Sequence, residues 1–266
     1  MPRSAQRPKN FVVEKEISSW KNYLEIVTSP SYKNWAFRGH SEVKWQLWPT
    51  ISREFKNRRI LRKHWLGQEY RILRIFQRKA FHFLPDVPPV GDTPRWLALM
   101  QHHGAPTRML DFTWSPWVAA FFALEPATKD AAVWAINTRE LETYGFGPYP
   151  EPYSRPRKPK EWLKEYGFDR DGVTVGEPYF MNKRLIAQSG TLVIPHDITR
   201  PINSILGKRK DLVVKFILSG PEIRDKGLEE LYTMNLTYAT LFPDLDGLSR
   251  SLAYELEYHW GFDPKT

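Results

Sequence analysis

The stretch from residue 96 to residue 124, WLALMQHHGAPTRMLDFTWSPWVAAFFAL, constrains the fold more than any other part of the chain. It places His102, His103, Arg108 and Asp111 within ten residues, between two apolar segments. Polar groups held between apolar segments must be satisfied by one another or by a ligand. The stretch is therefore the densest candidate for a functional site, together with the earlier tripeptide Phe37-Arg38-Gly39.

Length and charge set the organisation that we expect. A chain of 266 residues can bury one sizeable core, so we expect a single domain over 1–266. An N-terminal helical extension (about 1–34) precedes its first motif, and a Pro-rich basic insertion (about 143–180) interrupts it. The formal net charge of +9 favours a polyanionic partner such as nucleic acid, although a generally basic soluble protein fits equally well.

The chain has no cysteine, which excludes disulfides, thiol catalysis and cysteine-ligated metals. No apolar run approaches the roughly 18 residues of a membrane span, and the first residues lack the apolar core of a signal peptide. These features predict a cytoplasmic protein without a membrane partner.

Hydrophobic periodicity predicts an α+β fold, because helices come first and then strands alternate with helices. One predicted helix, over 68–83, turns Tyr70, Leu73, Phe76, Ala80 and Phe83 inward. The other helices are expected over 18–27, 94–103, 118–122, 221–234 and 245–260, and the strands over 36–39, 110–113, 131–137, 184–195 and 211–218. Five prolines between 144 and 160 predict irregular structure across the insertion.

Arg38 and Asp111 are the leading candidates for chemistry. Arg38 comes at the end of a predicted strand beside Gly39, and a guanidinium fork binds phosphate or carboxylate in a bidentate manner. The alternative is a structural pair with Asp or Glu. Asp111 can accept from Arg108, accept from a ribose hydroxyl or cap the next helix, for which Ser115-Pro116 is the better candidate.

Other site classes find little support. His102 and His103 are adjacent, so on a helix they point about 100° apart and cannot easily bind one metal, and no HExxH pattern occurs. We therefore expect no metal, while one of the two histidines remains a candidate for ligand binding or proton transfer. The absence of a G-x-S-x-G motif argues against a serine hydrolase. In the insertion, phosphate contacts or a solvated charge run would both explain Arg155, Arg157, Lys158 and Lys160.

The order of these motifs resembles the FRG domain family. The resemblance rests on Phe37-Arg38-Gly39, on QHHGAPTRMLDFTWSPWVAAFFAL, on Arg184 with Gln188 and Gly190, and on LFPDLDGL, and it spans residues 35–252. It identifies a family and leaves the activity open.

A fainter resemblance is to ADP-ribosyltransferases of the arginine–serine–glutamate type. Arg38 matches their aromatic-Arg-Gly strand, the 111–123 segment is similar to their second strand and helix, and Gln188-Ser189-Gly190-Thr191 is similar to their third element. It implies a split mixed or antiparallel sheet with flanking helices, and NAD as substrate. The implied catalytic residues are Arg38, Asp111 and Gln188, and the implied NAD-binding residues are Phe37, Arg38, Gly39, His103, Arg108, Phe112, Thr113, Trp114 and Ser115.

The chain departs from that pattern because no glutamate lies in the loop AQSG over 187–190. Glu69, Asp111 or Asp246 must then supply the negative charge, with Asp111 the first choice; otherwise the enzyme is slow or the pocket only binds. The leading hypothesis is an ADP-ribosyltransferase that modifies nucleic acid (RNA favoured over single-stranded DNA) as a toxin or anti-phage effector, with an antitoxin as a possible partner. The alternatives are a non-catalytic nucleotide- or nucleic-acid-binding module and a metal-independent nuclease.

Overall fold

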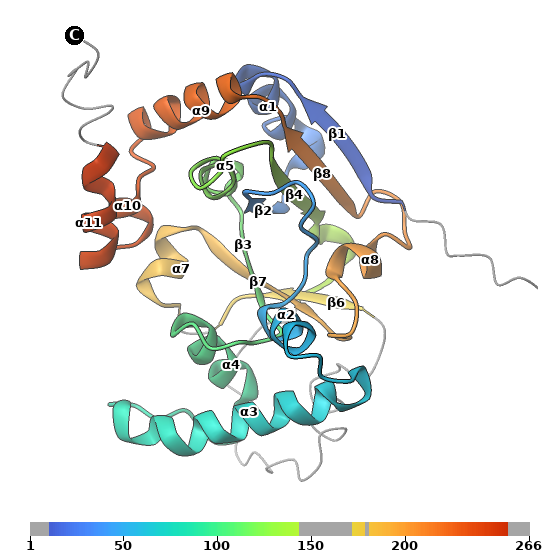
Figure 1. Cartoon of the computed structure of the whole chain (residues 1–266), viewed down its shortest axis with the longest axis vertical. Coiled ribbons are helices and arrows are strands. Elements are labelled where there is room, and N and C mark those ends of the chain that lie inside the picture. Colours follow the sequence, from blue (N-terminus) through green and yellow to red (C-terminus); the bar gives the residue numbers. More distant parts are fainter. Residues whose placement is uncertain (1–10, 144–171, 179–180, 255–266) are drawn as a thin grey trace, which may run out of the picture.

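One mixed sheet organises the molecule, flanked by helices (Figure 1). The computed structural model describes residues 11–143, 172–178 and 181–254. The strand order is β1-β8-β4-β2-β3-β7-β6-β5, with β1 parallel to β8, β5 parallel to β6 and every other pair antiparallel. The strands are β1 (Val13–Ile17), β2 (Trp35–His40), β3 (Leu110–Thr113), β4 (Ala131–Asn137), β5 (Glu142–Thr143), β6 (Val173–Gly176), β7 (Gly190–Pro195) and β8 (Val213–Leu218).

The expected α+β class, with a mixed sheet and flanking helices, is confirmed. The helices are α1 (Trp20–Val27), α2 (Thr50–Asn57), α3 (Trp65–Ala80), α4 (Thr93–His102), α5 (Pro116–Leu124), α7 (Lys183–Ala187), α8 (Ile202–Leu206), α9 (Pro221–Thr233), α10 (Tyr238–Leu241) and α11 (Leu245–Tyr254). Short 3-10 turns cover Pro30–Tyr32, Arg62–His64, Phe81–Phe83 and Thr138–Glu140. Within the described residues, no helix has both the length and the apolar character needed to cross a membrane.

Helix α5 is buried against β2 and β4, as its sequence predicts. Ser115 caps it by accepting from the backbone N–H of Val118, and Pro116 occupies its first turn. Nearly all of its side chains are apolar and buried, so it packs on the sheet with α1 and α9 around it (Figure 1). This core fixes one wall of the site described below.

Helices α3 and α4 pack together beneath the other half of the sheet (Figure 1). Leu192 and Ile194 of β7 contact this pair in one apolar cluster with Trp96 and Met100 of α4. Asp111 of β3 is in register with Leu192, so its side chain lies on the same face, next to α4.

Three strands were not predicted from the sequence: β1, the two-residue β5 (Glu142–Thr143) and β6. Val13–Ile17 forms the edge strand β1 instead of part of a helical extension. Val173–Gly176 forms β6 inside the segment predicted to be irregular, because its β-branched residues pair with β7 downstream of the prolines. The rest of the insertion, 144–171, lies outside the described residues, including Arg155, Arg157, Lys158 and Lys160.

Two further expectations are wrong. The 184–195 segment begins as helix α7, capped by the Asn182 side chain, and only then becomes strand β7 at Gly190. Phe83 does not point inward: α3 ends at Ala80, and Phe83 is 83% exposed. The predicted helix 245–260 is described only over Leu245–Tyr254.

Candidate functional site

The sheet almost separates into two halves between β2 and β3. These strands share one register pair, Phe37 with Thr113, whereas β2 and β4 share six. The two strands therefore diverge on the Arg38 side of Phe37. A cleft of about 540 Å³ opens at this divergence, a size typical of small-molecule sites.

Several elements line the cleft. The Phe37-Arg38-Gly39 motif contributes from β2, Asp111-Phe112-Thr113 from β3 and Gln188 from the end of α7. Helices α4 and α5 form two walls, and Arg53 of α2 and Phe242 also contribute. The structure thus brings together the three residues predicted to be catalytic, Arg38, Asp111 and Gln188.

The half-buried Arg38 spans the split. Its Nη1 donates a short hydrogen bond to the backbone carbonyl of Asp111, and its Nε donates to Nε2 of His40 at 3.2 Å. Both acceptors are neutral, and among the described residues no carboxylate forms an ion pair with Arg38. Burial lowers the pKa of the guanidinium, the charge of Arg53 acts in the same direction, and Asp111 opposes them. The cation is therefore fixed in place with its charge largely available to a ligand.

His40 supports Arg38 as a neutral side chain. Burial, followed by the neighbouring Arg38 charge, lowers the pKa of His40 to about 3. Since Nε2 accepts from Arg38, the neutral ring carries its proton on Nδ1. The sequence analysis missed His40, although it directly follows Gly39.

The cleft has a surplus of positive charge. Arg38, Arg53 and Arg184 line it, and Asp111 is the one acidic side chain among its described lining residues. Arg184 is paired with Asp244 at 2.6 Å, but Arg53 is exposed and its described partner is the hydroxyl of Thr50. An anionic ligand is favoured by this balance.

The Asp111 carboxylate is exposed to the cleft and held from one side. Its Oδ2 accepts from Nε2 of Gln101 at 3.0 Å. The Gln101 Oε1 in turn accepts a short hydrogen bond from the buried Thr107 hydroxyl, which fixes the orientation of the amide. Gln101 is thus a supporting residue that the sequence analysis did not select, although it precedes the two histidines on α4.

Gln188 and Thr113 connect the strands to the loop. The Thr113 hydroxyl donates to the Gln188 carbonyl at 2.7 Å, and the Gln188 side-chain Nε2 donates to the Leu241 carbonyl at 3.0 Å. One of the two amide N–H groups of Gln188 is therefore used by the backbone, which leaves the other N–H as a donor and Oε1 as an acceptor.

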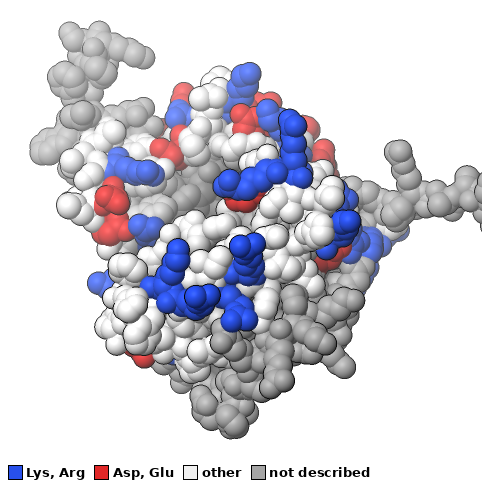
Figure 2. All heavy atoms as spheres, turned by 60° about the horizontal axis from the view of Figure 1, so that its bottom comes forward, with Lys and Arg blue, Asp and Glu red and all other residues white. Residues whose placement is uncertain are grey.

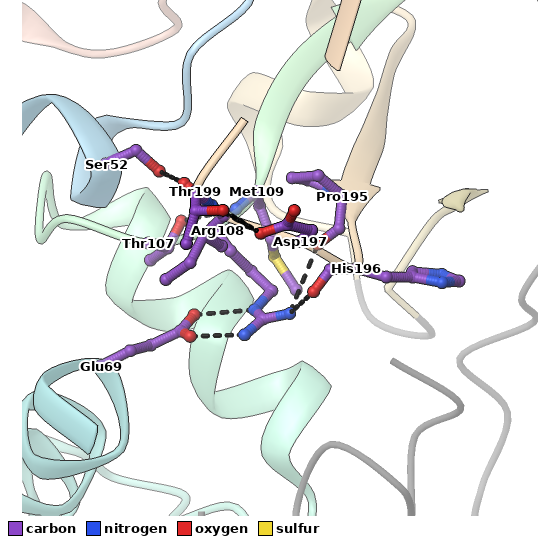
Figure 3. Close-up of polar contacts among 10 residues, drawn as sticks. Ser52, Glu69, Thr107, Arg108, Met109, Pro195, His196, Asp197 and Thr199 are labelled. Atoms are coloured by element: carbon purple, nitrogen blue, oxygen red, sulfur yellow. Dashed lines mark hydrogen bonds and ion pairs between the residues drawn. The ribbon is translucent and has the colours of Figure 1, made fainter. Parts of the chain in front are cut away.

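Arg108, predicted to bind NAD, is not among the described residues that line the cleft. It is fully buried on the far side of α4 and pairs with Glu69 of α3, with Nε to Oε1 at 2.7 Å and a second, shorter contact (Figure 3). Its Nη1 also donates to the carbonyls of Pro195 and His196. The guanidinium of Arg108 makes these hydrogen bonds within the core, so both Arg108 and Glu69 have a structural role.

Three other predicted ligand contacts are absent from the described lining of the cleft. Trp114 lines a separate groove beside Trp117, and its Nε1 donates to Glu177. Ser115 is occupied as the helix cap, and His103 is exposed beyond the end of α4. His102 lines the cleft instead, because Ala98, Gln101 and His102 share one face of α4. Burial, followed by His103 and Arg184, lowers the pKa of His102.

Comparison with known proteins identifies one family. Among models of protein families, the FRG domain matches residues 33–132, which contain β2, β3, α5 and the Arg38–Asp111 contact. Neither the curated proteins nor the solved structures contain a significant match. Among the described residues, no group of three or more His, Asp or Glu side chains is placed to hold a metal ion.

Proposed function

We propose that the cleft of the region matching the FRG domain, residues 33–132, binds NAD and transfers ADP-ribose to an acceptor. The observation that carries the proposal is the guanidinium of Arg38 at the split between β2 and β3. It is held by two neutral acceptors and faces a cleft with more arginines than carboxylates. A pyrophosphate carries two negative charges, which would lie against Arg38 and Arg53, the two lining arginines that form no ion pair with a described carboxylate.

The shape of the sheet supports the same ligand. The resemblance to ADP-ribosyltransferases implies a split sheet with the arginine of the first strand inside the split, and here β2 and β3 separate directly after Phe37. Phe112, Phe37 and Phe242 add apolar lining for a flat ring such as nicotinamide.

Asp111 is the residue proposed to assist transfer. In that step the bond between C1′ of the ribose and the nicotinamide nitrogen breaks, and neutral nicotinamide leaves with the electron pair. The acceptor's nucleophilic atom forms the new bond to C1′ and releases its proton to a base. The Asp111 carboxylate is the group in the cleft that can offset the positive charge developing on the ribose and receive that proton. Gln188 Oε1 would accept from a ribose hydroxyl.

A specific observation favours a second candidate function, binding of a nucleotide without turnover. By the resemblance drawn from the sequence, Gln188 takes the place of the catalytic carboxylate of ADP-ribosyltransferases, and its amide nitrogen already donates to the Leu241 carbonyl. Gln101 also occupies one oxygen of Asp111. A cleft with Arg38 but a weak charge-stabilising group would bind NAD and turn it over slowly or not at all.

The test combines NAD binding with nicotinamide release. Calorimetric titration measures binding of NAD to the purified full chain, and chromatography measures free nicotinamide after incubation with RNA, single-stranded DNA or cell lysate. Arg38→Lys keeps the charge but loses the guanidinium fork, so we expect weaker binding by roughly tenfold or more. Asp111→Asn should retain binding and lose nicotinamide release.

Two matched controls carry the same chemical changes away from the cleft. Arg209→Lys alters an exposed arginine paired with Glu140, and Asp225→Asn alters an exposed aspartate on α9. Both should behave as wild type. Absence of NAD binding by a folded wild-type protein would refute the proposal, whereas NAD binding without nicotinamide release would establish the second candidate.

A further inference from the structure

The segment from Lys56 to Lys79 is unusually one-sided in charge. It contains nine lysines and arginines but one acidic residue, Glu69, which is 1% exposed and paired with the buried Arg108. The basic residues are Lys56, Arg58, Arg59, Arg62, Lys63, Arg71, Arg74, Arg78 and Lys79. The segment therefore presents positive charge to solvent without an exposed acidic side chain of its own.

Helix α3 concentrates this charge on one face. Arg71, Arg74 and Arg78 follow one another at spacings of three and four residues, so they share a side of the helix, and Lys79 lies beside them. Arg71, Arg78 and Lys79 are exposed, and Arg74 is half-buried over the Tyr70 ring. None of these four forms an ion pair with a described carboxylate. Figure 2 shows Lys and Arg gathered on the side of the molecule where α3 lies.

Exposed aromatic side chains stand at the C-terminal end of this basic face. Phe81 is 59% exposed and Phe83 is 83% exposed, in the turn that directly follows α3. Apolar rings of this size are normally buried, and here they extend into solvent three and five residues beyond Arg78. Cations next to exposed aromatic rings match the two parts of a single-stranded nucleotide, the phosphate and the base.

We propose that the face of α3 formed by Arg71, Arg74, Arg78, Lys79, Phe81 and Phe83, here called the α3 face, binds single-stranded nucleic acid. Arg71 to Arg78 spans about 10 Å along the helix, a length over which one strand carries about three phosphates. The three arginines contact those phosphates, and the two phenylalanines stack on the bases that follow.

The position of the α3 face relates it to the cleft. Helix α3 packs directly on α4, and α4 carries Gln101 and His102 into the cleft wall. Both α3 and α4, each about 10 Å across, therefore lie between a strand on the α3 face and the cleft. Binding to the α3 face does not require a ligand in the cleft, so this proposal and the proposed NAD chemistry fail independently.

Fluorescence anisotropy with labelled 20-nucleotide RNA and DNA single strands tests the proposal. About three phosphate contacts predict a slope near −2 for the logarithm of affinity against the logarithm of salt concentration, or roughly a twentyfold loss of affinity between 50 and 200 mM salt. The triple variant Arg71→Gln, Arg74→Gln, Arg78→Gln should bring that slope close to zero. The double variant Phe81→Ala, Phe83→Ala should lose about fivefold or more in affinity while keeping the slope.

The matched control removes three charges from the opposite side of the molecule. Lys21→Gln, Lys129→Gln, Lys226→Gln changes exposed lysines on α1, after α5 and on α9, and should leave the slope within about 0.5 of wild type. Melting temperatures confirm that all variants fold. Equal loss in control and triple variants would overturn the proposal, as would binding to vesicles of anionic lipid without binding to either single strand. Equal affinity for duplex and single-stranded probes would refute the stacking role of Phe81 and Phe83.

Discussion

Replacing Glu69 by Gln should strongly destabilise the protein, because it leaves a charged guanidinium buried without its counter-ion. Both Arg108 and Glu69 are at most 1% exposed, and Arg108 Nε lies 2.7 Å from Glu69 Oε1. Removing one partner of a buried ion pair costs about 3–5 kcal/mol. Gln keeps one hydrogen-bond acceptor, and two backbone carbonyls also accept from Arg108, so we expect about 3 kcal/mol.

Urea unfolding followed by circular dichroism measures this loss as a change in the free energy of unfolding. A loss of about 3 kcal/mol corresponds to a melting temperature lower by roughly 6–12 °C for a domain of this size. The double variant Glu69→Leu, Arg108→Met replaces both charges with apolar side chains, and it should recover most of the stability. This recovery separates the loss of a charge partner from a general disturbance of α3.

The matched control is Glu54→Gln, which removes the carboxylate of an exposed pair with Arg58 at 2.8 Å. Exposed pairs contribute about 0–1 kcal/mol, so this variant should unfold nearly as wild type does. If Glu69→Gln and Glu54→Gln cost the same, the argument from desolvation is wrong. If Arg108→Met instead weakens NAD binding and leaves stability unchanged, Arg108 belongs to the ligand site after all.

Three further outcomes follow from the geometry around the cleft. Gly39→Ala should destabilise the fold by about 2 kcal/mol or more in urea unfolding, because its Cβ would lie 2.0 Å from the Ala119 carbonyl oxygen and 2.5 Å from the Ala123 nitrogen; equal stability would show that α5 can shift. Ser115→Ala should cost about 1 kcal/mol through loss of the α5 cap, and Ser115→Asp should retain the cap, as thermal melting can check. His40 has a pKa of about 3 when folded and about 6.5 when unfolded, so the unfolded state binds the extra proton and stability falls as pH drops from 6.5 towards 3. Between pH 6 and pH 5 the wild type should lose about 1 kcal/mol more than His40→Gln, and equal losses would contradict the assignment.

The sequence predicted those helices and strands whose ends and buried faces are determined by their own residues. Helix α5 has a capping serine, a first-turn proline and an apolar body, and α4 and β3 on its N-terminal side have similarly local signals. Strand β1 has no such signal, since three consecutive charged residues stand between its two apolar ones, Val13 and Ile17. It is held by pairing with β8, some 200 residues away. The pattern of residues within one short segment does not show which strand, so far away in the chain, will pair with it.

The site shows the same division. The order of the motifs predicted that Arg38, Asp111 and Gln188 share one site, but it also predicted that Arg108 binds the ligand there. Arg38 and Arg108 look alike in sequence, since each is an arginine next to one large apolar residue, Phe37 or Met109. What separates them is the partner: Glu69 satisfies Arg108, whereas a carbonyl and a neutral imidazole hold Arg38. Glu69 lies 39 residues before Arg108, and helix periodicity alone gives no reason to join them.

The three residues of the Phe37-Arg38-Gly39 motif together explain why the cleft lies where it does. Phe37 makes the one register pair with β3 and packs in the α5 core, so it ends the contact between the two halves of the sheet. Gly39 lets the backbone of α5 approach β2 more closely than any side chain would permit, which holds β2 against α5 and away from β3 beyond Phe37. Arg38, between them, has no register partner on β3, and its side chain bridges the gap to the Asp111 carbonyl of that strand. Since each residue has a separate physical task, substitution of Phe37 or Gly39 should close or distort the cleft and lower stability, whereas substitution of Arg38 should remove one of its positive charges and leave the sheet intact.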